Sequence, residues 1–381
     1  MHWASAVSQF PDADRAAGEA CDLLTEKMRG APPSLIVAFA SAHHADSMLS
    51  IGEQVRRSFP DALLFGCSAH SVIGAGREIE EGPGIALTGA HLPGVELHPF
   101  HVPAGRLPEL PVPDETDFLL LGDAFSPELE GILTQLDESF PERTKVGGLA
   151  SGAQQPGENL LYLGDETLRA GLVGVAIHGN IALDTIVAQG CRPVGHPLFV
   201  TRAEGNVIHE VDGMPPIEVL NELFEQAEDA RERALFQSSM FLGLAMRPAE
   251  DQYGQGDYLI RNLLGADDET GALHVAAQIE PRQVVQFHLR DAHTADNDLD
   301  GHLERYQQLG AKPGGALLFS CLGRGQGLYG VPDHDSDALR EALGELPIGG
   351  FFCNGEIGPV GGRTFLHGYT SAFALFRSMA N

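Results

Sequence analysis

The stretch DFLLLGDAFSPELEGILTQLDESFPERTKVGGLASG, residues 117–152, contains a complete strand–helix–strand unit. Its first apolar run, 117–126, predicts a buried strand. Apolar residues then recur at spacings of three and four, which places them on one face of a helix. They are Leu129, Ile132, Leu133, Leu136 and Phe140. Pro141 follows where that helix cannot continue, and 144–152 predicts a second strand that ends in small residues.

The same unit occurs twice more in the chain. First strands are predicted at 34–41 and 315–325, and second strands at 62–71 and 348–358. The intervening helices carry the apolar sets Met48, Ile51, Val55, Phe59 and Leu339, Ala342, Leu343, Leu346. Each helix again ends before a proline, Pro60 or Pro347. Because each second strand leads into further strand segments, we interpret the chain as three copies of a strand–helix–strand–hairpin unit.

This organisation predicts an α/β fold of α+β character, with two domains and mixed sheets. We expect an N-terminal domain over 1–195, which contains the first two copies, and a C-terminal domain over 196–381. The stretch GCRPVGHP, 190–197, is typical of a boundary. The C-terminal domain would contain the third copy together with an inserted helix and strands, and a further helix is predicted over 294–309.

Composition excludes several classes of function. A net charge of −29 repels nucleic-acid backbones and anionic lipid, so we expect neither as a partner. Five cysteines without paired spacing predict neither a disulfide framework nor a zinc site. The N-terminus has no signal-peptide pattern and no apolar run reaches the ~20 residues of a spanning helix, so we expect a cytoplasmic protein.

Two further motifs suggest chemistry that the sequence leaves open. Gly325-x-Gly327-x-x-Gly330 matches a dinucleotide-binding pattern, but we expect no helix to begin at these glycines, so nucleotide binding is disfavoured. Cys321 ends a predicted strand three residues before Arg324, whose charge would favour a thiolate. An enzyme or a covalent ligand trap based on Cys321 is therefore the alternative to a binding module, and no catalytic residue is assigned.

The polar residues at the predicted strand ends form the candidate ligand site. An arginine would bind a ligand carboxylate in a bidentate manner, and Glu356 would bind a cationic group, as the two ends of an amino acid require. Arg261, inside an apolar strand, needs a carboxylate such as Glu356 or a ligand. The predicted site residues are Cys67, Ser68, Arg261, Asn262, Cys321, Arg324, Cys353, Asn354 and Glu356.

Several segments resemble the FIST family, which has paired FIST N and FIST C domains. These are FGCSAHSVIG (65–74), PVGHPLFVTRAEGNVIHEVDG (193–213), YLIRNLLGADDETGALHVAAQIEPRQVVQFHLRDA (258–292), GALLFSCLGRGQGLYG (315–330) and GGFFCNGEIGPVGGRTFLHGYT (349–370). The resemblance covers nearly the whole chain, and its C-terminal segments are the most specific.

The resemblance implies a sensory domain that binds small ligands, with amino acids or related metabolites proposed. In such proteins the output is a histidine kinase, a chemoreceptor or a cyclase, and we expect a separate protein to supply it here. The resemblance also implies haem as a cofactor in some members. No other cofactor and no metal are predicted, and a haem-binding gas sensor stays open as an alternative because an axial histidine needs no local motif.

Overall fold

The computed structural model describes residues 1–227, 229–247 and 252–379. It is a mixed α/β protein, as the sequence predicts, and it divides into two compact units. Unit 1 contains Met1–Val187, Asp300–Leu366 and Thr370–Asn381, and unit 2 contains Ala188–Leu299 and His367–Tyr369. The expected domains, 1–195 and 196–381, are each continuous in sequence, and this division stays a prediction.

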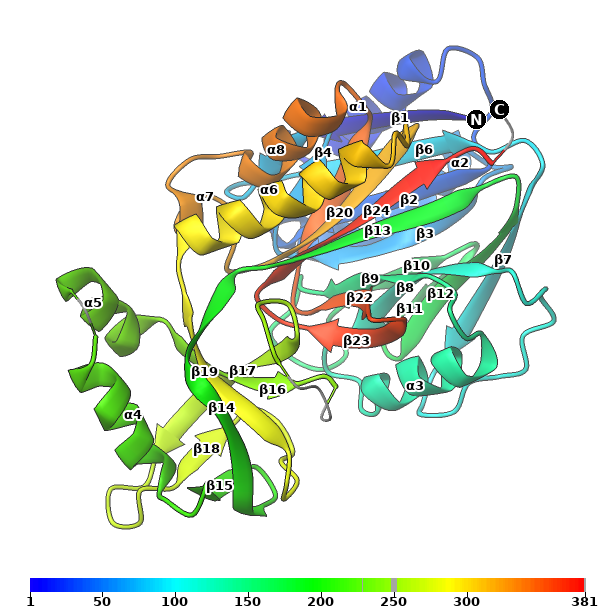
Figure 1. Cartoon of the computed structure of the whole chain (residues 1–381). Helices are drawn as coiled ribbons and strands as arrows, with labels where there is room; N and C mark the ends of the chain where they lie inside the picture. The colour runs from blue at the N-terminus through cyan, green and yellow to red at the C-terminus, as the bar shows by residue number, and fades with distance from the viewer. Residues whose placement is uncertain (228, 248–251, 380–381) are drawn as a thin grey trace. The chain divides into compact units, whose positions relative to one another are not determined.

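Unit 1 contains all three copies of the repeated unit, which confirms the repeat (Figure 1). Copy 1 consists of β2 (Leu35–Ser41), α2 (Met48–Ser58), β3 (Leu63–Ala69), the hairpin β4 (Val72–Gly74) and β5 (Arg77–Ile79), and β6 (Ile85–His91). Copy 2 consists of β8 (Asp117–Asp123), α3 (Leu129–Ser139), β9 (Lys145–Ala150), the hairpin β10 (Leu161–Leu163) and β11 (Glu166–Leu168), and β12 (Leu172–Gly179). Copy 3 consists of β20 (Gly315–Cys321), α7 (Gln326–Tyr329), α8 (His334–Leu343), β21 (Ile348–Cys353), the hairpin β22 (Glu356–Val360) and β23 (Arg363–His367), and β24 (Thr370–Arg377).

The copies form three separate sheets that are joined by exchanged hairpins. Within each copy the first two strands are parallel, and the last strand pairs antiparallel with the first. The hairpin of each copy, however, extends the sheet of another: β4–β5 pairs with β21, β10–β11 with β3, and β22–β23 with β9. Each copy therefore needs the other two to complete its sheets.

One glycine in each second strand allows the parallel strands to approach closely. Gly66, Gly147 and Gly350 lie opposite Ala38, Leu120 and Leu318 in the three registers. A Cβ atom on any of the three glycines would overlap the carbonyl oxygen of the residue opposite. The registers therefore align the copies residue by residue, and a side chain is sterically excluded at the same position in each.

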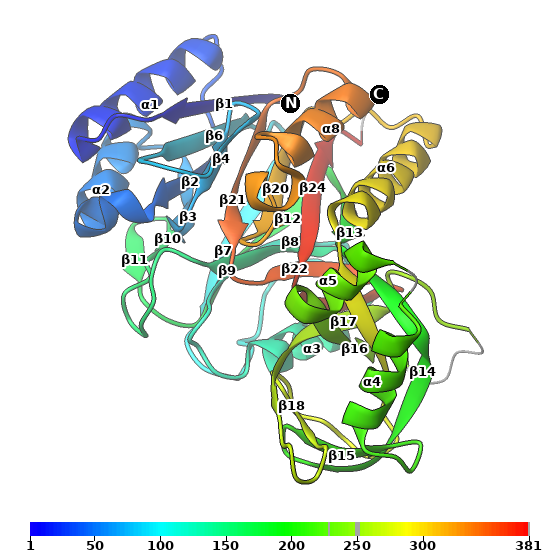
Figure 2. The same cartoon turned by 90° about the vertical axis from the view of Figure 1, so that its left-hand side faces the viewer.

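The edge of each sheet is formed by an additional strand. These strands are β1 (His2–Ser8) beside β6, β7 (Val95–Val102) beside β12, and β13 (Ala182–Gln189) beside β24. The strand β1 leads into α1 (Ala13–Lys27), whose N-cap Asp12 accepts a hydrogen bond from Arg15 N. Figure 2 shows α1 and α2 on the same face of the first sheet, where they enclose an apolar core.

The inner faces of the three sheets share a central core. Phe39 from copy 1, Val146 from copy 2 and Phe351 from copy 3 all belong to it. The rings of Phe39 and Phe351 stack with their centroids 4.6 Å apart. Because the three inner faces bury one another, the strands are apolar on this side in all copies.

Unit 2 is built on a small closed barrel. Its strands are β14 (Cys191–Glu204), β15 (Val207–Val211), β16 (Met240–Ala245), β17 (Tyr258–Ala266), β18 (Leu273–Val275) and β19 (Val284–Arg290). The helices α4 (Pro216–Glu225) and α5 (Ala230–Ser238) belong to this unit. The helix α6 (Ala292–Gln308) confirms the helix predicted over 294–309. Among the described residues, no helix has the length and hydrophobicity to cross a membrane.

Candidate functional site

The register of the three sheets shows that copy 3 is polar where the other copies are apolar. Near the end of the first strand, copy 3 pairs Ser320 with Ser371. The equivalent pairs are Ala40 with Ile85 in copy 1 and Gly122 with Leu172 in copy 2. Since two copies form the same sheet without hydroxyl groups here, the fold does not require them in copy 3.

Glu356 is the second departure from the repeat. It lies opposite Gly148 at the start of the exchanged hairpin. The residues in the same position of the other hairpins are Val72, opposite Phe351, and Leu161, opposite Cys67. Glu356 is fully buried, as are both of its apolar counterparts. A buried carboxylate has thus replaced an apolar residue of the repeated core, at a cost in desolvation free energy.

Asp335 is the third departure. The first buried residue of the helix is Met48 in copy 1 and Leu129 in copy 2, whereas it is Asp335 in copy 3. An aspartate near a helix start usually accepts hydrogen bonds from the first turn, so the sequence favours that role for Asp335 or Ser336. The helix α8 instead begins after Asp333, and the carboxylate of Asp335 is 1% exposed and faces other side chains.

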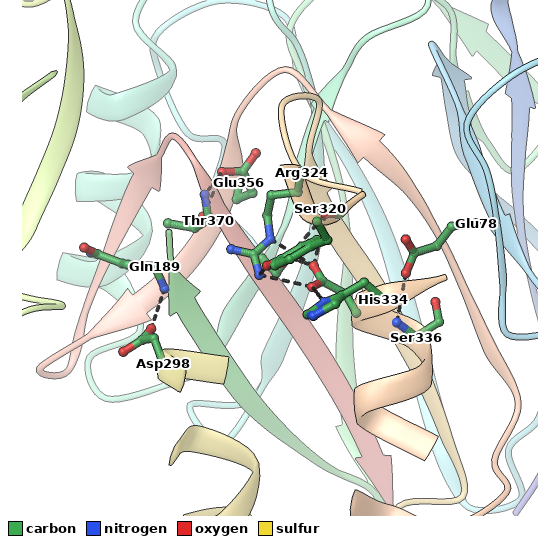
Figure 3. A network of polar contacts seen from close by, with 12 residues as sticks. Glu78, Gln189, Asp298, Ser320, Arg324, His334, Ser336, Glu356 and Thr370 are labelled. Atoms are coloured by element: carbon green, nitrogen blue, oxygen red, sulfur yellow. Dashed lines mark hydrogen bonds and ion pairs between the residues drawn. The ribbon is translucent and has the colours of Figure 1, made fainter. Parts of the chain in front are cut away.

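Arg324 and Asp335 form a buried bidentate ion pair (Figure 3). Arg324 Nε lies 2.9 Å from Asp335 Oδ2, and Nη2 lies 3.1 Å from Oδ1. Ser371 also donates a hydrogen bond to Asp335. Burial alone would raise the pKa of Asp335, but the Arg324 guanidinium and these hydrogen bonds hold it well below its usual range. The pair is therefore charged at neutral pH.

The residues between β20 and α8 cover this ion pair. Tyr329 accepts a hydrogen bond from Arg324 Nη2, and its ring stacks on the His334 imidazole with centroids 3.4 Å apart. Tyr329 belongs to the four-residue helix α7, which lies between Gly325 (φ 70°) and Gly330 (φ 75°). Both glycines adopt the left-handed conformation that favours glycine, so they fix the turns on either side of this cover.

One nitrogen of the Arg324 guanidinium has no hydrogen-bond partner among the described residues. Arg324 is 1% exposed, and its Nη1 atom is buried. The Nε and Nη2 edge already binds Asp335, which leaves Nη1 for an additional acceptor. A buried donor without an acceptor costs about 1–3 kcal/mol. Nη1 is accordingly the atom of this cluster that is positioned to bind an acceptor supplied by another molecule.

Glu356 is anchored at the same end of the third sheet. Its Oε2 atom accepts hydrogen bonds from Thr370 N at 3.1 Å and from Thr370 Oγ1 at 2.7 Å. Thr370 and Ser371 are consecutive in β24, so Glu356 and Asp335 are held by neighbouring residues of one strand. Figure 3 shows Glu356 beside Thr370 at this strand end. Side chains of consecutive strand residues point to opposite faces, so the two carboxylates flank the strand end from opposite sides.

Two glutamates from the exchanged hairpin of copy 1 contribute to the cluster. Glu78 Oε1 accepts a hydrogen bond of 2.8 Å from Ser336 N in the first turn of α8. Glu80 accepts from Gln326 N at the start of α7. The expectation that no helix begins at the glycine run is therefore wrong. The helix start is nevertheless occupied by a carboxylate of the protein itself, which would repel a pyrophosphate.

The pKa of Glu78 predicts a pH dependence of stability. Burial, followed by the negative charge of Asp335, raises this pKa to about 8. The unfolded glutamate ionises near pH 4.3, so the folded protein binds the extra proton between these values. Stability consequently decreases as pH rises from about 5 to 8, by at most about 1.4 kcal/mol per pH unit from this group.

The variant Glu78→Gln should remove this contribution. We expect urea denaturation at pH 5, 6.5 and 8 to show a progressively larger stability advantage of the variant over the wild type as the pH increases. A constant difference across the three pH values would contradict the assignment. Glu53→Gln provides the control, because Glu53 lies exposed on α2.

The structure brings several predicted site residues together at the strand ends. Cys321 and Cys353 lie opposite each other in the register of β20 and β21, and Arg324 N donates to Cys321 O at 2.8 Å. The thiols of Cys67 and Cys353 are buried in the central core, and burial raises the pKa of each well above its usual value. Cys321 is half-buried, and the nearby Arg324 charge is engaged by Asp335.

Of the remaining predicted residues, Asn354 lies at the same strand end and Ser68 lies in copy 1. Ser68 is buried at the end of β3, where its hydroxyl contacts Asn159 Oδ1 at 3.2 Å. Asn354 is exposed in the turn after β21. Arg261 and Asn262 belong to β17 in unit 2, and Asn262 accepts a hydrogen bond from Tyr369 of the same unit. The pairing of Arg261 with Glu356 stays a prediction.

Sequence reasoning missed Ser320, Tyr329, His334, Ser371, Thr370 and Glu78. Only an alignment of the three copies in correct register would have found some of them. Such an alignment makes Ser320 equivalent to Ala40 and Ser371 equivalent to Ile85. A polar residue in a position that is apolar in another copy is a usable signal. Glu78 carries no such signal, because it reaches the cluster through the exchanged hairpin.

Two pockets in the described part of the chain offer no unoccupied histidine Nε2 atom as an axial ligand for haem. One pocket, of 540 Å³, contains His2, whose Nε2 already contacts Lys27 O at 3.1 Å. The other, of 670 Å³, has a largely polar lining without histidine. His44 and His288 are buried, but neither lines either pocket. We therefore derive no function from haem.

Two domain models match this chain and identify it as a protein with paired FIST domains. The FIST N domain model matches residues 34–214 and the FIST C domain model matches residues 216–359. The chain belongs to this family. FIST domains are generally regarded as sensory domains that bind small ligands in signalling proteins.

Similar proteins occur in mycobacteria and in a plant. An uncharacterised protein of Mycobacterium tuberculosis, Rv0628c, is 39% identical over 97% of this chain and 98% of its own length. The uncharacterised protein Mb0898c of Mycobacterium bovis is 36% identical over 97% of each chain. The F-box/LRR-repeat protein At5g63520 of Arabidopsis thaliana is 25% identical over 65% of this chain and 55% of its own length.

Proposed function

We propose that this protein is a sensory module that binds a small, amino-acid-like ligand at the strand ends of copy 3. The observation that carries the proposal is the register comparison of the three copies. Ser320, Asp335, Ser371 and Glu356 occupy positions that are small or apolar in the equivalent strands and helices of copies 1 and 2. Polar groups that the fold does not require are expected where a ligand is bound.

The charges of this cluster suggest how the ligand binds. A ligand carboxylate accepts hydrogen bonds from Arg324 Nη1, the buried donor that has no partner among the described residues. A ligand ammonium group is attracted by the Glu356 carboxylate on the other side of the strand end. The ligand lies across the carboxyl ends of β20 and β21, the usual location of ligand sites in α/β sheets.

Access to Arg324 requires a movement of the covering segment. Tyr329 occupies one edge of the guanidinium, and it is only partly buried. A rotation at Gly325 and Gly330 would displace Tyr329 and expose Arg324. We propose that this displacement is the response to the ligand, and that it is transmitted to a separate signalling protein such as a histidine kinase, a chemoreceptor or a cyclase.

A thermal-shift screen over the amino acids and related metabolites tests the proposal. We expect at least one ligand to raise the Tm of the wild type, and we expect Glu356→Gln to reduce that shift. Glutamine preserves an acceptor for Thr370 but removes the charge that attracts the ammonium group. Stabilisation by none of the compounds, or an equal shift in the variant, would rule out this site.

A further inference from the structure

The strand ends of copy 1 are the counterpart of the candidate site in copy 3, and they contain an open pocket. The pocket has a volume of 670 Å³ and is formed within unit 1. It is lined by Ala45 and Asp46 between β2 and α2, by Leu49 in the first turn of α2, by several residues within 152–160 before the exchanged hairpin of copy 2, and by Arg169. In copy 3 the corresponding segments carry Arg324, Asp335 and the hairpin glutamates.

The hairpin registers align the two sites residue by residue. Val72 pairs with Ile79 in one hairpin, and Leu161 pairs with Leu168 in the other. Val72 and Leu161 are equivalent, so the next residues, Glu80 and Arg169, are equivalent too. Glu80 contacts the covering helix α7 in copy 3. Arg169 instead lines the pocket in copy 1, and the charge at this position is reversed.

The connection between strand and helix explains why the pocket of copy 1 is open. In copy 3 this connection covers 322–333 and includes α7, which lies over the polar cluster. In copy 1 it is the shorter segment Ala42–Ser47. This segment is a short 3-10 helix, and its residues Ala45 and Asp46 line the pocket without closing it. We infer that the space occupied by the cover in copy 3 is available to a ligand in copy 1.

The base of the pocket is fixed by buried hydrogen bonds. Leu160, which lines the pocket, donates from its backbone to Ser68 Oγ at 3.0 Å. Ser68 in turn contacts Asn159, whose Nδ2 donates to Asp123 Oδ1 at 3.0 Å. Ser68, Asn159 and Asp123 are all buried. The predicted site residue Ser68 thus supports the wall of the pocket, and the wall is formed before a ligand arrives.

The charges of the lining determine the class of ligand. The charged lining residues are Asp46, Glu158 and Arg169. The neutral amides of Gln154 and Gln155 also line the pocket. One cation and two anions complement a molecule with one carboxylate and two cationic groups. The net charge of −29 also attracts cations to the surface. We propose that this pocket binds a cationic amino acid, whose carboxylate contacts Arg169 and whose ammonium groups contact Asp46 and Glu158.

Calorimetric titration with L-lysine tests this proposal. We expect L-lysine to bind the full-length protein. L-norleucine lacks the side-chain ammonium group, and its affinity should be lower by about tenfold or more. Arg169→Gln and the double variant Asp46→Asn/Glu158→Gln should each weaken L-lysine binding by about tenfold or more. All three residues are exposed, so the variants should remain folded. The exposed Arg106→Gln is the matched control and should bind normally.

The outcomes separate this pocket from the site in copy 3. Loss of binding in Arg169→Gln, with binding retained in Glu356→Gln, supports the pocket of copy 1 even when the proposed function of copy 3 fails. Loss in Glu356→Gln with normal binding in Arg169→Gln assigns L-lysine to copy 3 and overturns the inference. Absence of any heat of binding with L-lysine overturns it as well.

Discussion

Replacement of Arg324 by methionine is expected to lower the free energy of unfolding by about 3–5 kcal/mol. The substitution leaves the carboxylate of Asp335 buried without its cation, and an uncompensated buried charge has a cost of this order. Urea denaturation at neutral pH measures the effect. Arg57→Met is the control, because the pair between Arg57 and Glu53 is exposed and should contribute less than about 1 kcal/mol.

The double variant Arg324→Met/Asp335→Leu separates the requirements of the fold from those of the ligand. It makes the third copy resemble the first two, where Met48 and Leu129 are the first buried helix residues. Ser320 and Ser371 retain each other as hydrogen-bond partners at 3.2 Å. We expect the double variant to recover stability to within about 1–2 kcal/mol of the wild type. If the double variant were as unstable as Arg324→Met, the Arg324–Asp335 ion pair would be required for the stability of the fold.

Replacement of Gly147 by alanine should destabilise the protein by at least about 3 kcal/mol. The new methyl group would overlap the carbonyl oxygen of Leu120, which is backbone and cannot move without disturbing the pairing of β8 and β9. Chemical denaturation of the variant measures the loss, and failure to fold would have the same meaning.

The matched control for this variant is Gly131→Ala. Gly131 lies in α3, and no atom is near the position of its Cβ. Alanine in a helix should therefore stabilise the protein by about 0.4–1 kcal/mol. Similar stabilities of the Gly147 and Gly131 variants would contradict the close approach of the strands, and with it the register on which the comparison of the copies depends.

The repeat was predictable because its signals are local. The helices α2 and α3 end just before Pro60 and Pro141, and their apolar residues lie on one face. The helix α8 ends earlier than predicted, at Leu343, because Gly344 terminates it before Pro347 is reached. The exchange of hairpins was not predictable in this way. A short strand such as β4 carries no residue that specifies whether it pairs with its own copy or with β21, because that pairing is fixed by packing over a long sequence separation.

The candidate site was predicted only in part, for related reasons. Arg324 is predicted from its position three residues after Cys321 at a strand end, and Glu356 is predicted as a charge beside an apolar segment. Asp335 was interpreted as a helix cap, since an aspartate near a helix start usually has that role. The sequence suggests that Cys67 and Cys353 occupy matching positions near the ends of their strands, but the register aligns Cys353 with Ala69 and places Cys67 two residues earlier. A shift of two residues preserves the face of the strand, so the error left both thiols in the central core.

The most direct test of the central claim is a calorimetric titration of the double variant Arg324→Met/Asp335→Leu. The titrant is the compound that most stabilises the wild type in the thermal-shift screen, and the wild type is titrated in parallel. Because the double variant should be folded, a loss of binding cannot be attributed to unfolding. We predict binding to the wild type and no measurable heat with the double variant. Equal affinity of the two proteins for the compound would contradict a ligand site at the strand ends of copy 3.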